Sequence, residues 1–164
     1  HLSLRRQRQM CIRDSYTLEH DDGEGQKNLE LADVIIVGVS RTSKTPTCIY
    51  LANKGIKAAN YPLVPDIGVS KELDQVKSPT VVALITSAQT LVEIRRKRSL
   101  ELGLKDKETD YINVHKVEEE IIAAKRIFAN KGWPVIDITR RSVEETASAI
   151  MNIISLKEKK ENEQ

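Results

Sequence analysis

The sequence predicts an α/β fold in which a parallel sheet carries helices on both faces. Two observations lead to this prediction. Short apolar runs rich in β-branched residues alternate along the chain with longer segments of helical character. The runs are apolar throughout, as expected of strands that are covered on both faces. With 164 residues and a hydrophobic content of 40%, the chain can build one domain with a sizeable core.

The first strand is predicted at residues 32–38, where the run ADVIIVG is bounded by Asp33 and Gly38. Residues 44–55, KTPTCIYLANKG, are expected to form the next helix, which its final glycine ends. Residues 56–64 form a second extended segment, closed by prolines. The turn between the first strand and the helix therefore lies at the carboxyl end of a strand, where parallel sheets bind ligands.

The middle of the chain continues the alternation. Residues 69–76 predict a short helix, and residues 79–87, PTVVALITS, predict a third strand. A further helix is expected from Ser87 to Leu102, and residues 103–113 are expected to form a loop.

The last third of the chain predicts two helices on either side of a fourth strand. Gly132 ends the first of these helices, and the strand is predicted at residues 133–139, with Trp133 packed where helix and strand meet. Ser142, with Glu145 three residues later, predicts the start of the last helix. The apolar faces are Val117, Ile121, Ala124 and Phe128 on the first helix, and Val143, Ala147, Ile150 and Ile154 on the second.

The two ends of the chain differ in composition from the rest. Residues 1–15 begin with His1 and resemble translated sequencing-adapter sequence; a short basic arm of the native protein is the alternative. On the first interpretation the chain is the C-terminal piece of a longer protein. Residues 16–156 hold the predicted domain, and the charged residues 157–164 are expected to form a solvated tail.

The net charge of +2 does not indicate a nucleic-acid surface. Residues 1–15 carry four arginines and one aspartate, which leaves 22 basic and 23 acidic residues in the remainder. No apolar run approaches the roughly 18 residues of a membrane span, and no secretory signal precedes the first strand. Cys11 and Cys48 form no metal-binding spacing, Cys48 is expected in the core, and a cytoplasmic location fits best.

The turn GVSRTSKTP at residues 38–46 carries the most specific chemistry. A phosphate-binding loop of the pattern G-x-x-x-x-G-K-[ST] needs converging backbone N–H groups, a lysine that reaches the phosphate and a hydroxyl that can ligand Mg²⁺. Lys44 is the lysine and Thr45 the hydroxyl, and the positive end of the following helix favours an anion. The fold is therefore expected to be P-loop kinase-like. The predicted nucleotide-binding residues are Gly38, Val39, Ser40, Arg41, Thr42, Ser43, Lys44 and Thr45.

Two residues depart from the common pattern of such loops. Ser43 replaces the second glycine, and a positive φ there would cost about 1–2 kcal/mol. Pro46 places the start of the helix at or just before residue 46. Arg41 offers either a bidentate phosphate clamp or a surface charge. From these residues alone, a working phosphate site and a chance strand–turn–helix both remain open.

A resemblance to a known protein family favours the first of these alternatives, a working phosphate site. The stretch from Ala32 to Pro65 closely resembles the pyruvate, phosphate dikinase regulatory proteins, relatives of the phosphoenolpyruvate synthase regulatory proteins. The motifs HDDG at residues 20–23 and GWPVIDITRRSVEETA at residues 132–147 resemble the same family, so the likeness spans residues 16–156. The string SRTSKTP points to the dikinase branch, because the synthase branch more often has SRSGKT. The resemblance also implies that the family's N-terminal domain is missing here.

The resemblance implies a bifunctional enzyme. Such proteins use ADP to phosphorylate a threonine of the dikinase, which inactivates it, and use inorganic phosphate to remove the phosphoryl group as pyrophosphate. Lys44 would be catalytic, Asp21 or Asp22 beside His20 would act as the base, and Thr45 would hold Mg²⁺ if a metal is used. The expected partner is pyruvate, phosphate dikinase, and a homodimer is left open.

Several alternatives remain. Asp22 with the following glycine is also a good turn, and Asp137 either supports Mg²⁺ or caps a helix. His115 is expected at the surface. The alternative functions are a phosphoenolpyruvate synthase regulator with the same chemistry, a small-molecule ATP-dependent P-loop kinase, and a nucleotide-binding half that cannot act alone. The arginines that could clamp phosphate or dock a partner, but more often form solvated faces, are Arg95, Arg96, Arg98, Arg140 and Arg141.

Overall fold

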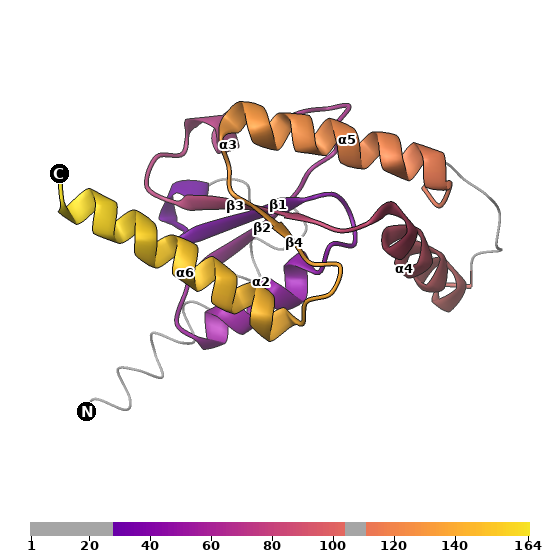
Figure 1. Ribbon diagram of the computed structural model, residues 1–164, viewed down its shortest axis with the longest axis horizontal. Coiled ribbons are helices and arrows are strands. Elements are labelled where there is room, and N and C mark those ends of the chain that lie inside the picture. Colours follow the sequence, from indigo (N-terminus) through magenta and orange to yellow (C-terminus); the bar gives the residue numbers. More distant parts are fainter. Residues whose placement is uncertain (1–27, 104–110) are drawn as a thin grey trace.

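The computed structural model describes residues 28–103 and 111–164 of the chain. These residues form three layers, with a sheet between two layers of helices (Figure 1). The sheet has four strands in the order β2-β1-β3-β4, and all neighbouring strands are parallel. The predicted α/β fold with helices on both faces is confirmed. The strands are β1 (Val34–Gly38), β2 (Ala58–Pro62), β3 (Thr80–Ile85) and β4 (Val135–Asp137).

Every predicted helix is present, and a short 3₁₀ turn, η2 (Leu29–Leu31), precedes β1. Gly132 has a left-handed conformation (φ 68°) and ends its helix as predicted. Ser142 begins the last helix by accepting a hydrogen bond from the N–H of Glu145, also as predicted. The helices are α2 (Lys44–Asn53), α3 (Lys71–Gln75), α4 (Ala88–Glu101), α5 (Val114–Lys131) and α6 (Val143–Asn162).

Helices α2 and α6 cover one face of the sheet (Figure 1). Their apolar side chains, including Leu51 and Ile150, pack against Val34, Ile36 and other strand residues that point to this face. Leu51, Ile150, Val34 and Ile36 are all fully buried, and Cys48 joins this cluster, as the sequence predicts. Burial of one such side chain stabilises the fold by about 1.5–3 kcal/mol.

Helices α3, α4 and α5 supply the apolar cluster on the opposite face. Leu91 of α4 and Phe128 of α5 pack with Ile35 and Val37, the β1 residues that alternate with those facing α2. The Trp133 ring lies 6.3 Å from the Phe128 ring, which confirms its predicted place where α5 ends. Because β1 is buried on both faces, its continuous apolar run is explained.

The register of the sheet brings the ends of β1 and β2 together. Gly38 pairs with Pro62, and the N–H of Leu63 donates a 2.8 Å hydrogen bond to the carbonyl oxygen of Gly38. The turn after β1 therefore starts at the carboxyl edge of the sheet, next to the segment that follows β2.

Helix α6 runs further than the sequence predicts. A tail is expected from residue 157, yet the helix continues to Asn162. Lys157 lies 3.8 Å from Glu161 one turn later, and its ammonium donates to the carbonyl oxygens of Ser78 and Pro79. Lysine and glutamate are good helix formers, so a solvated charged segment can extend an existing helix. None of the described helices is long and apolar enough to cross a membrane.

Candidate functional site

The turn between β1 and α2 is a strained loop. Two non-glycine residues within it have left-handed backbones, Arg41 with φ of 70° and Ser43 with φ of 57°. Each such residue costs about 1–2 kcal/mol, because its Cβ crowds the following carbonyl oxygen. Strain at two nearby positions is typical of a functional loop. The sequence leaves undecided whether Ser43 has a positive φ, and nothing in the sequence indicates a positive φ at Arg41.

Helix α2 starts directly after this loop. Its first residue is Lys44, two positions before Pro46, and Ser43 precedes the helix as its cap. The carbonyl oxygen of Ser43 accepts from the N–H of Thr47 at 3.2 Å and from the Thr47 hydroxyl at 2.7 Å. The first N–H groups of a helix have no acceptor one turn earlier in the helix, and they carry the positive end of its dipole. The helix thus starts at Lys44, within the predicted range of residues 44–55 and just before Pro46.

Gly38 is required by packing, not by its backbone angles. A Cβ at this position would lie 2.7 Å from the Thr42 hydroxyl oxygen and 2.9 Å from the Leu84 carbonyl oxygen. The second contact is with backbone on the neighbouring strand, which cannot move aside cheaply. The first glycine of the motif therefore lets the loop fold back against β3.

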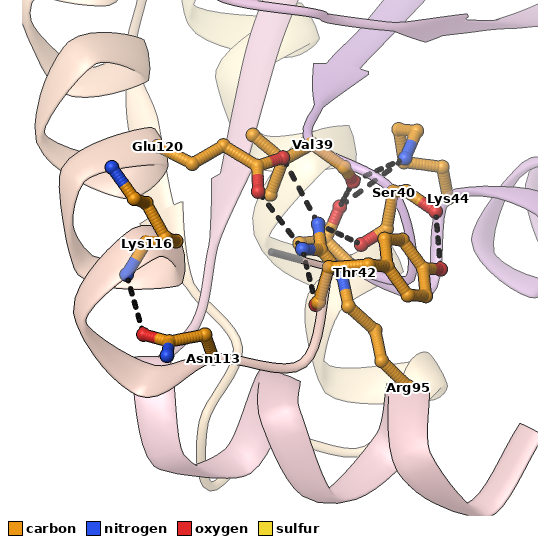
Figure 2. Close-up of polar contacts among 9 residues, drawn as sticks. Val39, Ser40, Thr42, Lys44, Arg95, Asn113, Lys116 and Glu120 are labelled. Atoms are coloured by element: carbon orange, nitrogen blue, oxygen red, sulfur yellow. Dashed lines mark hydrogen bonds and ion pairs between the residues drawn. The ribbon is translucent and has the colours of Figure 1, made fainter. Parts of the chain in front are cut away.

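The side chain of Lys44 lies inside the loop and is only 5% exposed. Its ammonium donates to the carbonyl oxygen of Val39 at 2.7 Å and to the hydroxyl of Thr42 at 3.4 Å (Figure 2). The Thr42 hydroxyl itself donates to the same carbonyl oxygen at 2.9 Å. In a trans peptide the carbonyl and N–H point in opposite directions, so the N–H of Ser40 points away from the ammonium.

A cavity of about 440 Å³ opens at the loop. Lys44 and Arg41 are the two cationic residues that line it, and no carboxylate is among its described lining residues. This charge balance, together with the helix N-terminus, favours an anion. Six of the eight predicted binding residues line the cavity, and Gly38 and Val39 do not. The lining is Ser40, Arg41, Thr42, Ser43, Lys44, Thr45, Pro46, Asn60, Pro62 and Ile94.

Asn60 of β2 contacts the predicted metal ligand. Its side-chain amide donates a 3.0 Å hydrogen bond to the hydroxyl oxygen of Thr45. A hydroxyl oxygen is a hard ligand of the kind that Mg²⁺ accepts, and Mg²⁺ usually keeps several waters and binds the phosphates of its nucleotide. The described residues contain no cluster of three or more metal-ligating side chains. A Mg²⁺ that arrived with a nucleotide would find the hydroxyl oxygen of Thr45 as a protein ligand.

Arg95 is not on a solvated face, so that interpretation of the arginine run is wrong for this residue. Its side chain is 1% exposed and donates to both carboxylate oxygens of Glu120, at 2.8 and 3.0 Å (Figure 2). It also donates to the carbonyl oxygen of Ser40, at 3.2 Å. Leu91 and Val92, one turn earlier on the same helix, are buried as well.

Tyr111 completes this group of residues and was missed in the sequence. Its ring centre lies 4.4 Å from the guanidinium carbon of Arg95, and its hydroxyl lies 3.1 Å from the Ser40 hydroxyl. Arg95 also donates to the Tyr111 carbonyl oxygen at 3.2 Å. These residues line a second cleft of about 760 Å³, which shares Ser40 and Pro62 with the loop cavity.

The other arginines of the sequence prediction stand apart from the loop. Arg98 is half exposed and lies 4.0 Å from Glu101 in the next turn of α4. Arg140 and Arg141 lie on the turn before α6, where both are exposed. Arg96 is half-buried. None of these four residues is in the described lining of the loop cavity, so the structure does not bring them to the site.

Asp137 ends β4 and holds a turn. Its carboxylate accepts from the hydroxyl of Thr139 at 2.6 Å and from the N–H of Thr139 at 2.9 Å. These two hydrogen bonds lower the pKa of the Asp137 carboxyl below its ordinary value, and the charges of Lys125 and Arg141 act in the same direction against the effect of burial. The structure thus favours the structural alternative for Asp137, which is absent from the cavity lining.

The residues predicted as the base lie outside the described part of the chain. These are Asp21 and Asp22, with His20 beside them. Their role stays a prediction. His115 is described, and its side chain is 89% exposed beside Glu118, in agreement with a surface role.

The chain matches a known protein family over most of its length. A model of a family described as kinase/pyrophosphorylase matches residues 11–151. The chain belongs to the kinase/pyrophosphorylase family. The matched residues include the whole of the strained loop and the helices α4 and α5 beside it, so the family assignment covers the described site.

Three relatives of this kinase/pyrophosphorylase chain share one name. It is 56% identical over 140 residues to a protein of Caulobacter vibrioides, 51% over 139 residues to one of Sphingopyxis alaskensis and 53% over 141 residues to one of Bartonella tribocorum. Each is named as a pyruvate, phosphate dikinase regulatory protein. The matches cover 85% of this chain in each case, and 44%, 51% and 50% of those three proteins. The chain therefore spans about half the length of the curated relatives it matches.

Proposed function

We propose that this chain holds the nucleotide- and phosphate-binding part of a bifunctional regulator of pyruvate, phosphate dikinase. In one direction the enzyme uses ADP to phosphorylate a threonine of the dikinase, and in the other it uses inorganic phosphate to remove that phosphoryl group. Membership in the kinase/pyrophosphorylase family supports this proposal, as do the names of the relatives. A cytoplasmic location is part of the proposal and rests on cysteine usage in the sequence.

The observation that carries the proposal is the position of Lys44. Its ammonium lies at the centre of a loop whose left-handed residues, Arg41 and Ser43, flank Thr42. Such a loop recognises a tetrahedral anion by charge and by backbone N–H groups, irrespective of what else the anion is bonded to. One site can therefore take the β-phosphate of ADP in the kinase direction and inorganic phosphate in the reverse direction.

In the kinase direction, the hydroxyl oxygen of the target threonine forms a bond to the β-phosphorus of ADP. The bond from that phosphorus to the bridging oxygen breaks, and AMP leaves with the bonding electron pair. The threonine proton goes to a base, for which Asp21 and Asp22 are the candidates. Lys44 and Arg41 stabilise the charge that spreads over the transferred group.

In the reverse direction, an oxygen of inorganic phosphate bonds to the phosphorus of phosphothreonine. The threonine oxygen leaves and takes a proton, and the products are threonine and pyrophosphate. The same two cations, Lys44 and Arg41, face the attacking phosphate in this direction. Magnesium, if it accompanies the nucleotide, would be held by Thr45 and would add positive charge at the phosphate oxygens.

The test uses ADP labelled at its β-phosphate, incubated with dikinase and with this chain or with the full-length relative of Caulobacter vibrioides. Label on a dikinase threonine, followed by release of labelled pyrophosphate when inorganic phosphate is added, is the expected result. Phosphoenolpyruvate synthase serves as the alternative protein substrate. Transfer only from the γ-phosphate of ATP, or only to a small metabolite, would contradict the proposal. If the full-length relative transfers label and this chain only binds ADP, the chain acts as the nucleotide-binding half of such an enzyme.

A further inference from the structure

Arg95 connects the phosphate-binding loop to two helices. Its guanidinium donates to the Ser40 carbonyl oxygen in the loop, to the Tyr111 carbonyl oxygen before α5 and to Glu120 within α5. Arg95 itself projects from α4 (Figure 2). A planar fork of five donors can make these contacts in one orientation, which a lysine cannot reproduce.

We infer that Arg95 is a positioning residue for the phosphate-binding loop, which acts by pinning the Ser40 carbonyl and so turning the N–H of Arg41 toward the anion cavity. The inference rests on the proposed function, since it names the residue that shapes the same site. Arg95 is not among the described residues that line the loop cavity, and its guanidinium is paired with Glu120 at 2.8 and 3.0 Å.

The geometry of the peptide bond gives the first step of the argument. The described residues contain no cis peptide bond, so the carbonyl of Ser40 and the N–H of Arg41 point in opposite directions. Arg95 holds the carbonyl on the side of α4 and α5, at 3.2 Å. The N–H of Arg41 is thereby directed away from these helices, and Arg41 lines the loop cavity.

The carbonyl of the preceding peptide, between Val39 and Ser40, is held on the other side of the chain. The Val39 carbonyl oxygen accepts from the Lys44 ammonium inside the loop, while the Ser40 carbonyl oxygen accepts from Arg95 outside it. The Ser40 carbonyl belongs to the peptide that directly precedes Arg41, so Arg95 holds one of the two peptides that define the left-handed φ of 70° at Arg41. A residue in this strained conformation persists only where its surroundings hold it.

The burial of Arg95 and a second contact to Ser40 also support the positioning role of Arg95. Arg95 is 1% exposed, so its side chain has little freedom to release the carbonyl. The Tyr111 ring lies against the guanidinium at 4.4 Å, and the Tyr111 hydroxyl lies 3.1 Å from that of Ser40. Both the main chain and the side chain of Ser40 are therefore attached to the group formed by Arg95, Tyr111 and Glu120.

The test is the variant Arg95→Lys, which keeps the charge beside Glu120 and removes the fork. We expect the affinity for inorganic phosphate, measured by calorimetry, to fall about tenfold, the loss typical of a broken charge-assisted hydrogen bond. The backbone amide resonance of Arg41 in ¹⁵N-labelled protein should move or broaden even before phosphate is added. The control Arg98→Lys changes an arginine of the same helix that is half exposed, and should leave both readouts unchanged.

An unchanged Arg41 amide and an unchanged phosphate affinity in Arg95→Lys would overturn the inference. If that variant does not fold, Glu120→Gln serves in its place, because it weakens the support of Arg95 and keeps an acceptor at the same position; an unchanged Arg41 amide there also overturns the inference. If the wild-type chain binds neither phosphate nor ADP, yet the Arg41 amide still depends on Arg95, the proposed function fails and the positioning role stands.

Discussion

The ammonium of Lys44 donates a 2.7 Å hydrogen bond to the carbonyl oxygen of Val39, so the lysine spans the loop from its last residue back to its beginning. This hydrogen bond connects the two ends of the loop through the lysine side chain. A lysine has three donors, and a phosphate that enters the cavity can share the same ammonium with this carbonyl. Lys44 therefore shapes the loop as well as supplying its charge.

The variant Lys44→Ala should abolish detectable binding of inorganic phosphate and ADP, and should lower the free energy of unfolding by about 1 kcal/mol through loss of the bond to Val39. Calorimetry measures the first effect and urea denaturation the second. Lys97→Ala is the matched control, since Lys97 is exposed on α4. Unchanged phosphate affinity in Lys44→Ala would refute the assignment of the loop.

Substitutions at Ser43 should separate backbone strain from side-chain chemistry. Ser43→Gly relieves the left-handed conformation at φ 57° and is expected to change the free energy of unfolding by between zero and about +1 kcal/mol, because added chain entropy offsets part of the gain. Ser43→Val should instead destabilise the protein, since a β-branched residue fits poorly at positive φ. Thermal denaturation compares the two. Equal stability of both variants would show that φ at this position is not positive in solution.

Gly38→Ala should impair folding and phosphate binding together. Its Cβ would lie 2.9 Å from the Leu84 carbonyl oxygen and 2.7 Å from the Thr42 hydroxyl oxygen, and relief of such overlap costs about 1–3 kcal/mol. Displacement of Thr42 would also disturb its bond to Val39. Gly68→Ala is the control, because Gly68 has positive φ with open space around it and should lose stability without losing phosphate affinity. Denaturation and calorimetry on both variants provide the comparison.

Asp137 should contribute a pH-dependent part of the stability. Its pKa is lowered in the folded protein by the hydrogen bonds from Thr139, so the contribution is present above the unfolded-state pKa of about 4 and is lost as pH falls through the folded-state value. The variant Asp137→Asn keeps an acceptor for Thr139 and removes the titration. We expect its free energy of unfolding to decline less than that of wild type between neutral and acidic pH, as measured by urea denaturation. A decline as steep as that of wild type would contradict this role.

The sequence predicted the sheet and its helices well because the strands are bounded by turn residues, and the run that forms the central strand β1 is buried on both faces. Val34 to Gly38 form one uninterrupted apolar run, and the positions of Ser142 and Gly132 report helix ends by local hydrogen bonding and backbone freedom. The turn between β1 and α2 was also predictable, since Gly38, Lys44 and Thr45 lie within a few residues of one another between a strand and a helix. Local rules suffice for all of these features.

The features that escaped prediction depend on contacts between distant residues. Arg95 stands in a run of four basic residues, and its burial follows from Glu120, 25 residues further on. The left-handed backbone of Arg41 depends on the peptide before it, which Arg95 holds. The end of α6 was missed for another reason, because a charged segment is equally soluble as a helix or as a tail.

The separation of Ser40 from its partners has a consequence for how the protein is made. Ser40 lies 55 residues before Arg95 and 71 before Tyr111, and Glu120 follows later still. As the chain emerges from the ribosome, β1 and α2 appear long before the helices that hold Ser40 in place. Closing contacts across such long intervals is also slow compared with forming a helix. A nascent chain that stops short of Glu120 therefore has the residues of the loop without the full set of side chains that hold Ser40 in place.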